Sequence, residues 1–195
     1  MKNSLIIVMV LISVLLFAGV GSANLIVNGG FETGDFTGWD LTGNTGYTGV
    51  TTVNPHSGSY SASLGPIGSD GYLLQSLPFS TTVGMQYDVE FWLYNLTSIP
   101  FDPYGNDFGV VYIGGTPGVL FSASNIPDQP YTEYHYIVTA NLSSSNLAFN
   151  FRNDPGFFFL DDVSVTSHVP EPATMLLLGS GLLGISLLSR KKFRK

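Results

Sequence analysis

The fold class follows from one ten-residue stretch, Gln86-Tyr-Asp-Val-Glu-Phe-Trp-Leu-Tyr-Asn95. Every second residue, from Tyr87 through Val89 and Phe91 to Leu93, is hydrophobic, and most residues between them are polar. Successive side chains of a β-strand point to opposite faces of the sheet. The stretch is therefore predicted to be a strand with one buried face and one wet face.

Similar short runs rich in Val, Thr, Tyr and Phe recur through residues 24–168, separated by Gly, Pro, Asn and Asp. No part of this region repeats its hydrophobic residues at the helical period of about 3.6. We expect further strands at 25–27, 47–53, 59–64, 72–77, 108–113, 133–140, 147–152 and 157–166. So many short strands with Gly/Pro turns predict an all-β fold, a two-sheet antiparallel jelly-roll sandwich.

The N-terminal residues 1–23 are predicted to be a signal peptide. Lys2 precedes an apolar run over 5–20, and Gly21-Ser22-Ala23 supplies the small residues that signal peptidase requires. Cleavage is expected between Ala23 and Asn24, and an uncleaved N-terminal anchor is the alternative.

The C-terminal region 169–195 has three elements in a fixed order: Val-Pro170-Glu171-Pro172, an uncharged apolar run over 173–189, and a tail with five basic residues among its last six. As a helix, the apolar run would be roughly 25 Å long, close to the ~30 Å hydrocarbon core of a bilayer. We expect a transmembrane helix, with the basic tail in the cytoplasm and the rest of the chain on the periplasmic side. The residues leading to Val169 look like a short tether to the membrane.

This C-terminal order resembles the PEP-CTERM sorting signal of Gram-negative bacteria. The resemblance implies recognition by an exosortase, transient anchoring in the inner membrane, removal of the anchor, and delivery to the cell surface or an extracellular polysaccharide matrix. An ordinary C-terminal anchor is the alternative.

The region between the two signals is strongly acidic. This region contains one basic residue, Arg152, and 13 of the 14 acidic residues of the chain. The net charge of the region is therefore near −12. Such a surface disfavours nucleic acid and anionic lipid, whose binding needs Lys and Arg. It suits divalent cations that prefer oxygen ligands, although solubility alone also explains it.

Cysteine is absent from the chain. Disulfides, thiolate metal sites and cysteine catalysis are therefore excluded. Residues 24–168 are long enough to bury one core without such cross-links, and we expect a single domain there.

Three segments of this domain resemble galactose-binding-like jelly-roll carbohydrate-binding modules: Leu25-Ile-Val-Asn-Gly-Gly-Phe-Glu-Thr-Gly-Asp-Phe-Thr-Gly-Trp39, Pro55-His-Ser-Gly-Ser-Tyr-Ser-Ala62 and Phe158-Phe-Leu-Asp-Asp-Val-Ser-Val165. The resemblance implies that Trp39 packs in the core and that the three segments converge on a structural calcium ion.

The calcium ligands implied by the resemblance are a Gly30 carbonyl, the Glu32 carboxylate, carbonyls of the turn that begins at His56, and Asp161. The alternative is that Glu32 and Asp161 are solvated surface residues. Strand alternation would place Asp162 on the face opposite Asp161.

The wet face of the 86–95 stretch is the predicted ligand site. Trp92 lies there between Glu90 and Tyr94, and sugar rings stack on aromatic side chains. Asn150 and Arg152 share one face of the strand over 147–152 and would form hydrogen bonds with the hydroxyl groups of the sugar. The alternatives are a covering loop over Trp92 and a salt bridge for Arg152.

Catalytic motifs are scarce: His56, His135 and His168 are widely separated, and no Gly-x-Ser-x-Gly motif occurs in the domain. We therefore expect a non-catalytic surface or matrix protein that binds or organises exopolysaccharide in biofilm or floc. The alternatives are an adhesive protein-binding module without sugar binding and, less favoured, a glycan-active hydrolase using Asp88 and Glu90.

Overall fold

The computed structural model describes residues 22–97, 105–114 and 118–168. Residues Ala23–His168 form one compact unit. The predicted signal peptide (but for its last two residues) and the predicted transmembrane segment lie outside the described residues, as does the sorting motif at 170–172. Within the described ranges, no helix has the length and apolar character needed to cross a membrane.

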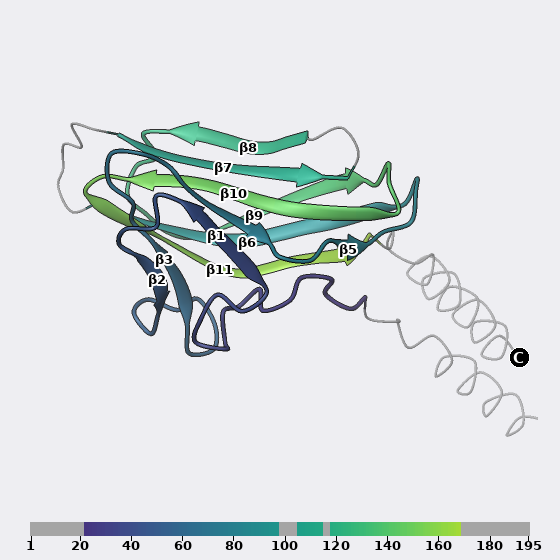
Figure 1. The fold of residues 1–195 in the computed structure, drawn as a ribbon, viewed down its shortest axis with the longest axis horizontal. Helices are drawn as coiled ribbons and strands as arrows, with labels where there is room; N and C mark the ends of the chain where they lie inside the picture. Colours follow the sequence, from purple (N-terminus) through teal and green to yellow (C-terminus); the bar gives the residue numbers. More distant parts are fainter. Residues whose placement is uncertain (1–21, 98–104, 115–117, 169–195) are drawn as a thin grey trace, which may run out of the picture. The chain divides into compact units, whose positions relative to one another are not determined.

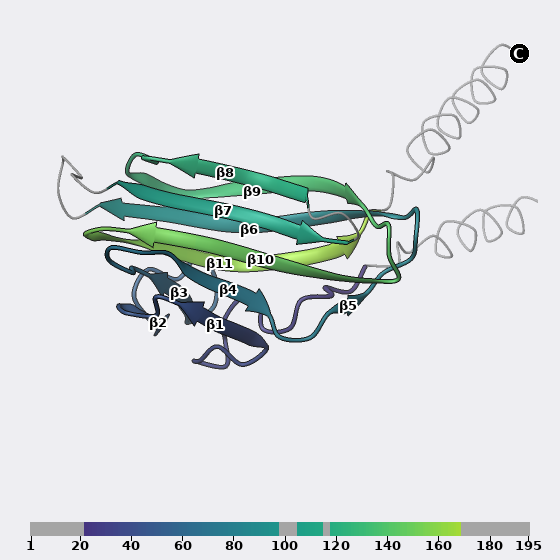
Figure 2. The same ribbon diagram turned by 45° about the horizontal axis from the view of Figure 1, so that its top comes forward.

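The domain consists of two antiparallel sheets packed face to face (Figures 1 and 2). The first sheet has the order β1 (Trp39–Gly43), β4 (Gly71–Gln75), β10 (Ser144–Asn153), β7 (Asn106–Ile113) and β8 (Gly118–Ser124), and β5 (Phe79–Ser80) pairs with β10. The second has the order β2 (Thr48–Thr51), β3 (Ser61–Leu64), β11 (Gly156–Ser167), β6 (Gln86–Thr97) and β9 (Gln129–Thr139). The prediction of an all-β two-sheet antiparallel sandwich is confirmed.

The alternation that predicted β6 is present in the structure. Tyr87, Val89, Phe91 and Leu93 are buried between the sheets, and the residues between them lie on the outer face. The ring of Phe91 lies 5.6 Å from that of Phe149, which comes from the first sheet, so β6 helps to join the two layers.

Eight of the nine predicted strands overlap a strand of the structure, and residues 25–27 do not. There the N–H of Leu25 donates to the carbonyl of Val165 without forming a ladder. The sequence reading missed β1, β5 and β8. Gly and Thr or Ser occur within or beside these strands, and β5 has only two residues, so hydrophobic alternation is weak in all three.

The predicted tether before Val169 is wrong. Strand β11 continues to Ser167, and the N–H of His168 donates to the carbonyl of Gln86. The residues that were expected to form a tether to the membrane are instead paired with β6. The hydrogen bonding of the sheet therefore extends to His168, the last described residue.

Because the strands are antiparallel, their connections gather at two ends of the sandwich. We call one the exit end: it contains the segments 76–78, 81–85 and 140–143 together with His168. The opposite end contains the segments 65–70, 125–128 and 154–155.

Candidate functional site

The first predicted segment is anchored by its aromatic residues. Phe31 is fully buried and stacks on Trp39 with 5.9 Å between ring centroids. The indole N–H of Trp39 donates to the carbonyl of Asn28. Trp39 therefore packs in the core as expected, and the segment leaves Glu32 on the surface.

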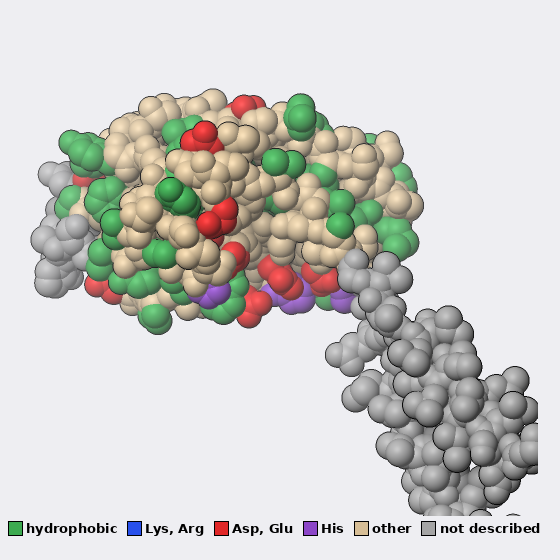
Figure 3. All heavy atoms as spheres, turned by 90° about the horizontal axis from the view of Figure 1, so that it is seen from below, with side chains coloured by type: hydrophobic (Ala, Val, Ile, Leu, Met, Phe, Trp, Pro, Cys, Tyr) green, Lys and Arg blue, Asp and Glu red, His purple; other side chains and the backbone are tan. Residues whose placement is uncertain are grey.

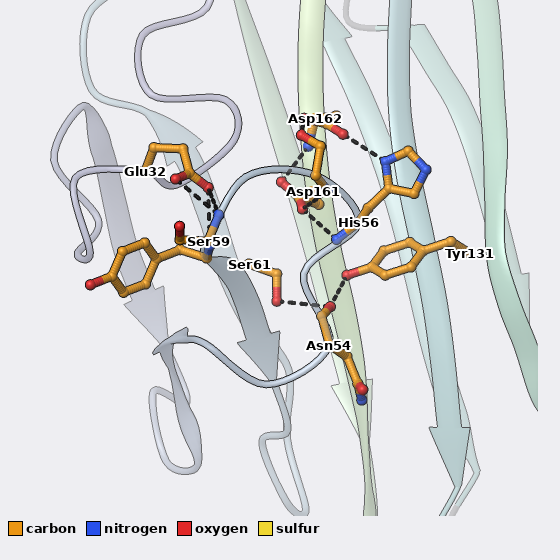
Figure 4. A network of polar contacts seen from close by, with 10 residues as sticks. Glu32, Asn54, His56, Ser59, Ser61, Tyr131, Asp161 and Asp162 are labelled. Carbon is orange, nitrogen blue, oxygen red and sulfur yellow. Dashed lines mark hydrogen bonds and ion pairs between the residues drawn. The ribbon is translucent and has the colours of Figure 1, made fainter.

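The three segments converge, as Figure 4 shows. One Glu32 carboxylate oxygen accepts the backbone N–H groups of Ser59 (2.9 Å) and Tyr60 (3.0 Å). One Asp161 oxygen accepts the N–H groups of His56 (2.8 Å) and Ser57 (3.2 Å). The turn over 56–60 is thus held between two carboxylates from opposite ends of the sequence. We call this arrangement the three-segment junction.

Glycine permits the close approach of the first segment to β11. A Cβ atom added at Gly29 would lie 1.9 Å from the carbonyl oxygen of Val163, and the N–H of Val163 donates to the carbonyl of Gly29. A Cβ at Gly30 would lie 3.7 Å from an Asp161 oxygen. Gly30 therefore lies beside Asp161, the carboxylate with which it was predicted to bind the same calcium ion.

Asp162 also reaches the turn, contrary to the expectation that it faces away from Asp161. The register of β11 against β6 shifts between Asp161 and Ser164, and Asp162 has φ 48°. Its carboxylate bonds His56 Nδ1 at 2.6 Å and accepts the Ser57 hydroxyl at 2.7 Å. The β-bulge redirects the side chain, and simple alternation cannot reveal a bulge.

Asp161 is fully buried. Burial raises its pKa to about 6, although hydrogen bonds from the N–H groups of Asp162, His56 and Ser57 act in the opposite direction. Removing a carboxylate from water penalises its charged form, and here that penalty exceeds the effect of the hydrogen bonds.

The contacts at the junction bear on calcium in two ways. A fully buried carboxylate with a raised pKa favours a cation nearby, and Gly30, Glu32, His56 and Asp161 do lie together. The turn, however, directs N–H groups rather than carbonyls at both carboxylates. Among the described residues, no group of three or more His, Asp or Glu is arranged to hold a metal ion. Calcium therefore stays a prediction.

A covering loop lies over Trp92. The ring of His56 stacks on it with 3.9 Å between centroids and an interplanar angle of 17°. Tyr131 packs against His56 at 5.0 Å and donates its hydroxyl to the carbonyl of Asn54. Tyr94 packs against Tyr131. His56 thus covers one face of the Trp92 ring.

The predicted ligand residues do not form one site. Glu90, Trp92 and Tyr94 lie on the outer face of the second sheet, whereas Asn150 and Arg152 lie on the outer face of the first. The two sets are therefore on opposite faces of the sandwich. Sequence shows which residues of one strand share a face, but it does not show which sheet the strand joins.

The outer face of the first sheet carries a set of groups suited to binding. Tyr72 of β4 is 46% exposed and lies opposite Asn150 of β10, which in turn lies opposite Gly109 of β7. Beside them, Arg152 forms an ion pair with Asp107 at 3.3 Å. We call these five residues the Tyr72 face. The sequence reading placed Tyr72 in a strand but did not consider its outward position between buried Gly71 and Leu73.

Two histidine side chains form hydrogen bonds with the carboxylate of Asp88 on the second sheet. His135 Nε2 lies 2.8 Å and His168 Nδ1 2.9 Å from one Asp88 oxygen. Figure 3 shows histidine and acidic side chains side by side along the lower edge of the domain in that view. Burial raises the pKa of Asp88, but the hydrogen bonds and charges of both histidines outweigh it, so the pKa is lowered overall. Asp88 is therefore engaged by imidazoles and does not form a pair with Glu90.

Comparisons with known proteins agree with both parts of the chain. Residues 168–192 match the PEP-CTERM protein-sorting motif. Among solved structures, the chain resembles a family 61 carbohydrate-binding module in complex with β-1,4-galactotriose (TM-score 0.61, 18% identity), with 75% of this chain and 100% of that chain covered. It also resembles a family 16 carbohydrate-binding module (TM-score 0.53, 16% identity; 74% and 100% covered). A further match is the CBM22-1 xylan-binding domain of Xyn10C from Paenibacillus barcinonensis (TM-score 0.52, 15% identity; 77% and 97% covered). No curated protein matches the sequence.

These findings define a class of protein: a two-sheet sandwich with the fold of carbohydrate-binding modules. The chain carries, in addition, a PEP-CTERM sorting motif. The motif implies export, sorting to the cell surface and processing by an exosortase.

Proposed function

We propose that this is a non-catalytic surface or matrix protein that binds exopolysaccharide through the Tyr72 face. The observation that carries the proposal is the half-exposed ring of Tyr72 beside the amide of Asn150, on a sandwich that shares its fold with carbohydrate-binding modules. After export and signal-peptidase cleavage, the protein would be held briefly in the inner membrane and then released by an exosortase into biofilm or floc.

The chemistry of this face suits a sugar. An aromatic ring offers an apolar surface for the C–H face of a pyranose, and a few polar groups fix its orientation. The Asn150 amide and the Arg152–Asp107 pair supply hydrogen-bond donors and acceptors on adjacent strands. At Gly109 a Cβ atom would lie 2.2 Å from the Asn150 side-chain oxygen, so the absence of a side chain there makes room for Asn150.

The full chain is expected to bind the exopolysaccharide of the cell that produces it. Tyr72→Ala should weaken this binding at least about tenfold, equivalent to about 1.4 kcal/mol. Affinity electrophoresis or a glycan array measures this. Tyr47→Ala is a matched control because Tyr47 is 70% exposed on the segment between β1 and β2. Trp92→Ala should leave affinity unchanged if the fold is intact.

Other outcomes would select the alternative functions. Equal binding by both tyrosine variants would contradict the role of the Tyr72 face. Failure of the unmodified chain to bind any glycan would favour an adhesive module that contacts proteins. Release of soluble products from polysaccharide would favour a hydrolase.

Calcium at the three-segment junction is part of the proposal. Glu32 and Asp161 would supply carboxylates, Gly30 a carbonyl, and the turn at His56 would complete an oxygen shell. The ion would balance the buried charge of Asp161 and tie the first segment to the last strand.

Calcium is expected to raise the melting temperature of the full chain, since a ligand at one hundred times its Kd stabilises a fold by about 2.7 kcal/mol. Differential scanning fluorimetry with calcium and with magnesium would measure the shift. Glu32→Gln should abolish it. A melting temperature unaffected by millimolar calcium, compared with chelator, would remove calcium from the proposal.

A further inference from the structure

The two ends of the sandwich differ in charge. The connections at the opposite end contain Asp70, Asp128 and Asp154. Residues 76–87 and 139–147, which include the exit-end connections and the strand ends that flank them, contain no Asp, Glu, Lys or Arg. Two carboxylates border this end, because the Ser76 hydroxyl donates to Asp40 and His168 bonds Asp88. The connections over 81–85 and 140–143 are themselves uncharged, in a domain with a net charge near −12.

The exit end is also apolar. Leu77 is 75% exposed, Val83 62%, Met85 47% and Leu142 51%. Val83 and Met85 lie beside the segment that holds Leu142, because the N–H of Gly84 donates to the carbonyl of Ala140 and the hydroxyl of Thr81 donates to the carbonyl of Leu142. Exposed hydrophobic residues gathered in this way mark an interaction surface.

The chain leaves the domain at this same end. His168 is fixed there by its backbone bond to Gln86 and its side-chain bond to Asp88. Only residues 169–172 separate it from the apolar run that begins at Ala173. An extended chain covers at most ~3.4 Å per residue, so His168 would lie within roughly 17 Å of the start of a membrane-embedded segment.

We propose that the exit end docks on the bilayer surface while the protein is membrane-anchored, with Val83, Met85 and Leu142 in the headgroup region. This inference rests on the proposed membrane stage of export. An uncharged apolar tip can enter the interface of an anionic membrane, whereas the acidic end of the domain is repelled from it. The domain would therefore stand upright on the membrane, with its acidic end pointing away.

Asp88 is compatible with this orientation. It is the acidic residue of β6 that lies closest in sequence to the exit end, and both His135 and His168 bond it. Two imidazole partners reduce the cost of bringing this carboxylate towards a negative surface.

The test uses the natural lack of cysteine, which allows a single environment-sensitive NBD label to be placed at will. Met85→Cys and Ile67→Cys are matched variants, because Met85 is 47% and Ile67 46% exposed while Ile67 lies at the opposite end. Each labelled full-length chain is reconstituted into vesicles of phosphatidylethanolamine and phosphatidylglycerol that contain a nitroxide-labelled lipid. The label at position 85 is expected to lose at least about half of its emission, as for a group within the interfacial ~5–10 Å, and the label at 67 almost none.

Two outcomes would overturn the inference, and they differ. If the chain stays in the vesicles after an alkaline wash but both labels are quenched equally, the docking is wrong and the membrane stage stands. If the wash removes the chain, the membrane stage and the docking both fail. In either case polysaccharide binding by the Tyr72 face is measured separately and is not affected.

Discussion

Replacing Asp161 with Ala is expected to lower the free energy of unfolding by about 3–5 kcal/mol, because removing a buried charged partner leaves its donors unsatisfied. The backbone N–H groups of His56, Ser57 and Asp162 all donate to this carboxylate. Without it the turn loses its bond to β11. Denaturant unfolding followed by tryptophan fluorescence measures the loss. Glu133→Ala is a control at an exposed acid, expected to change stability by less than about 0.5 kcal/mol.

The same residue predicts a pH dependence in the presence of chelator. Its folded-state pKa is raised from 3.8 to about 6, mainly by burial. A raised acid pKa means that the protonated form is favoured by folding, so this contribution is complete below about pH 4 and disappears as pH rises through about 6. Asp161→Asn cannot ionise and should lack this part of the pH profile. An unchanged profile in Asp161→Asn would show that Asp161 does not titrate in this range.

The second large effect is expected at Phe91. Phe91→Ala should cost about 3–5 kcal/mol, because the lost side chain leaves a cavity that its neighbours fill only in part. The ring lies 5.0 Å from Tyr134 of its own sheet, and 6.1 Å from Phe108 and 5.6 Å from Phe149 of the other sheet. Its removal therefore weakens contacts within the second sheet and between the two sheets.

Leu96→Ala on the same strand is the control for Phe91, since Leu96 is 40% exposed and should cost far less. The midpoint of urea unfolding would compare the two variants. Equal losses would mean that Phe91 is not central to the packing.

The fold was predictable where the signal is local. Each residue of β6 carries its own evidence of burial or exposure, so the alternation from Tyr87 to Leu93 was sufficient to predict the strand. Strands such as β8, with Gly118 and alternating Ser and Ala at its end, bury too little of their surface to show such a pattern.

The candidate site was predictable only where a resemblance supplied the long-range pairing. The convergence of Glu32, the turn at His56 and Asp161 followed from family motifs. The stacking of His56 on Trp92 and the redirection of Asp162 depend on contacts between residues far apart in sequence and on a bulge. The separation of Trp92 from Asn150 depends on sheet assignment, which is also a non-local property.

The position of β11 has a consequence for biogenesis. This strand lies between β3 and β6 inside the second sheet, although it is the last strand of the described chain. While the polypeptide crosses a membrane from its N-terminus, the sheet lacks its interior strand until residues 156–167 have emerged. The sheet can therefore be completed only after residues 156–167 have crossed, and a proteolytic cut between β10 and β11 would detach a central strand and not a dispensable tail.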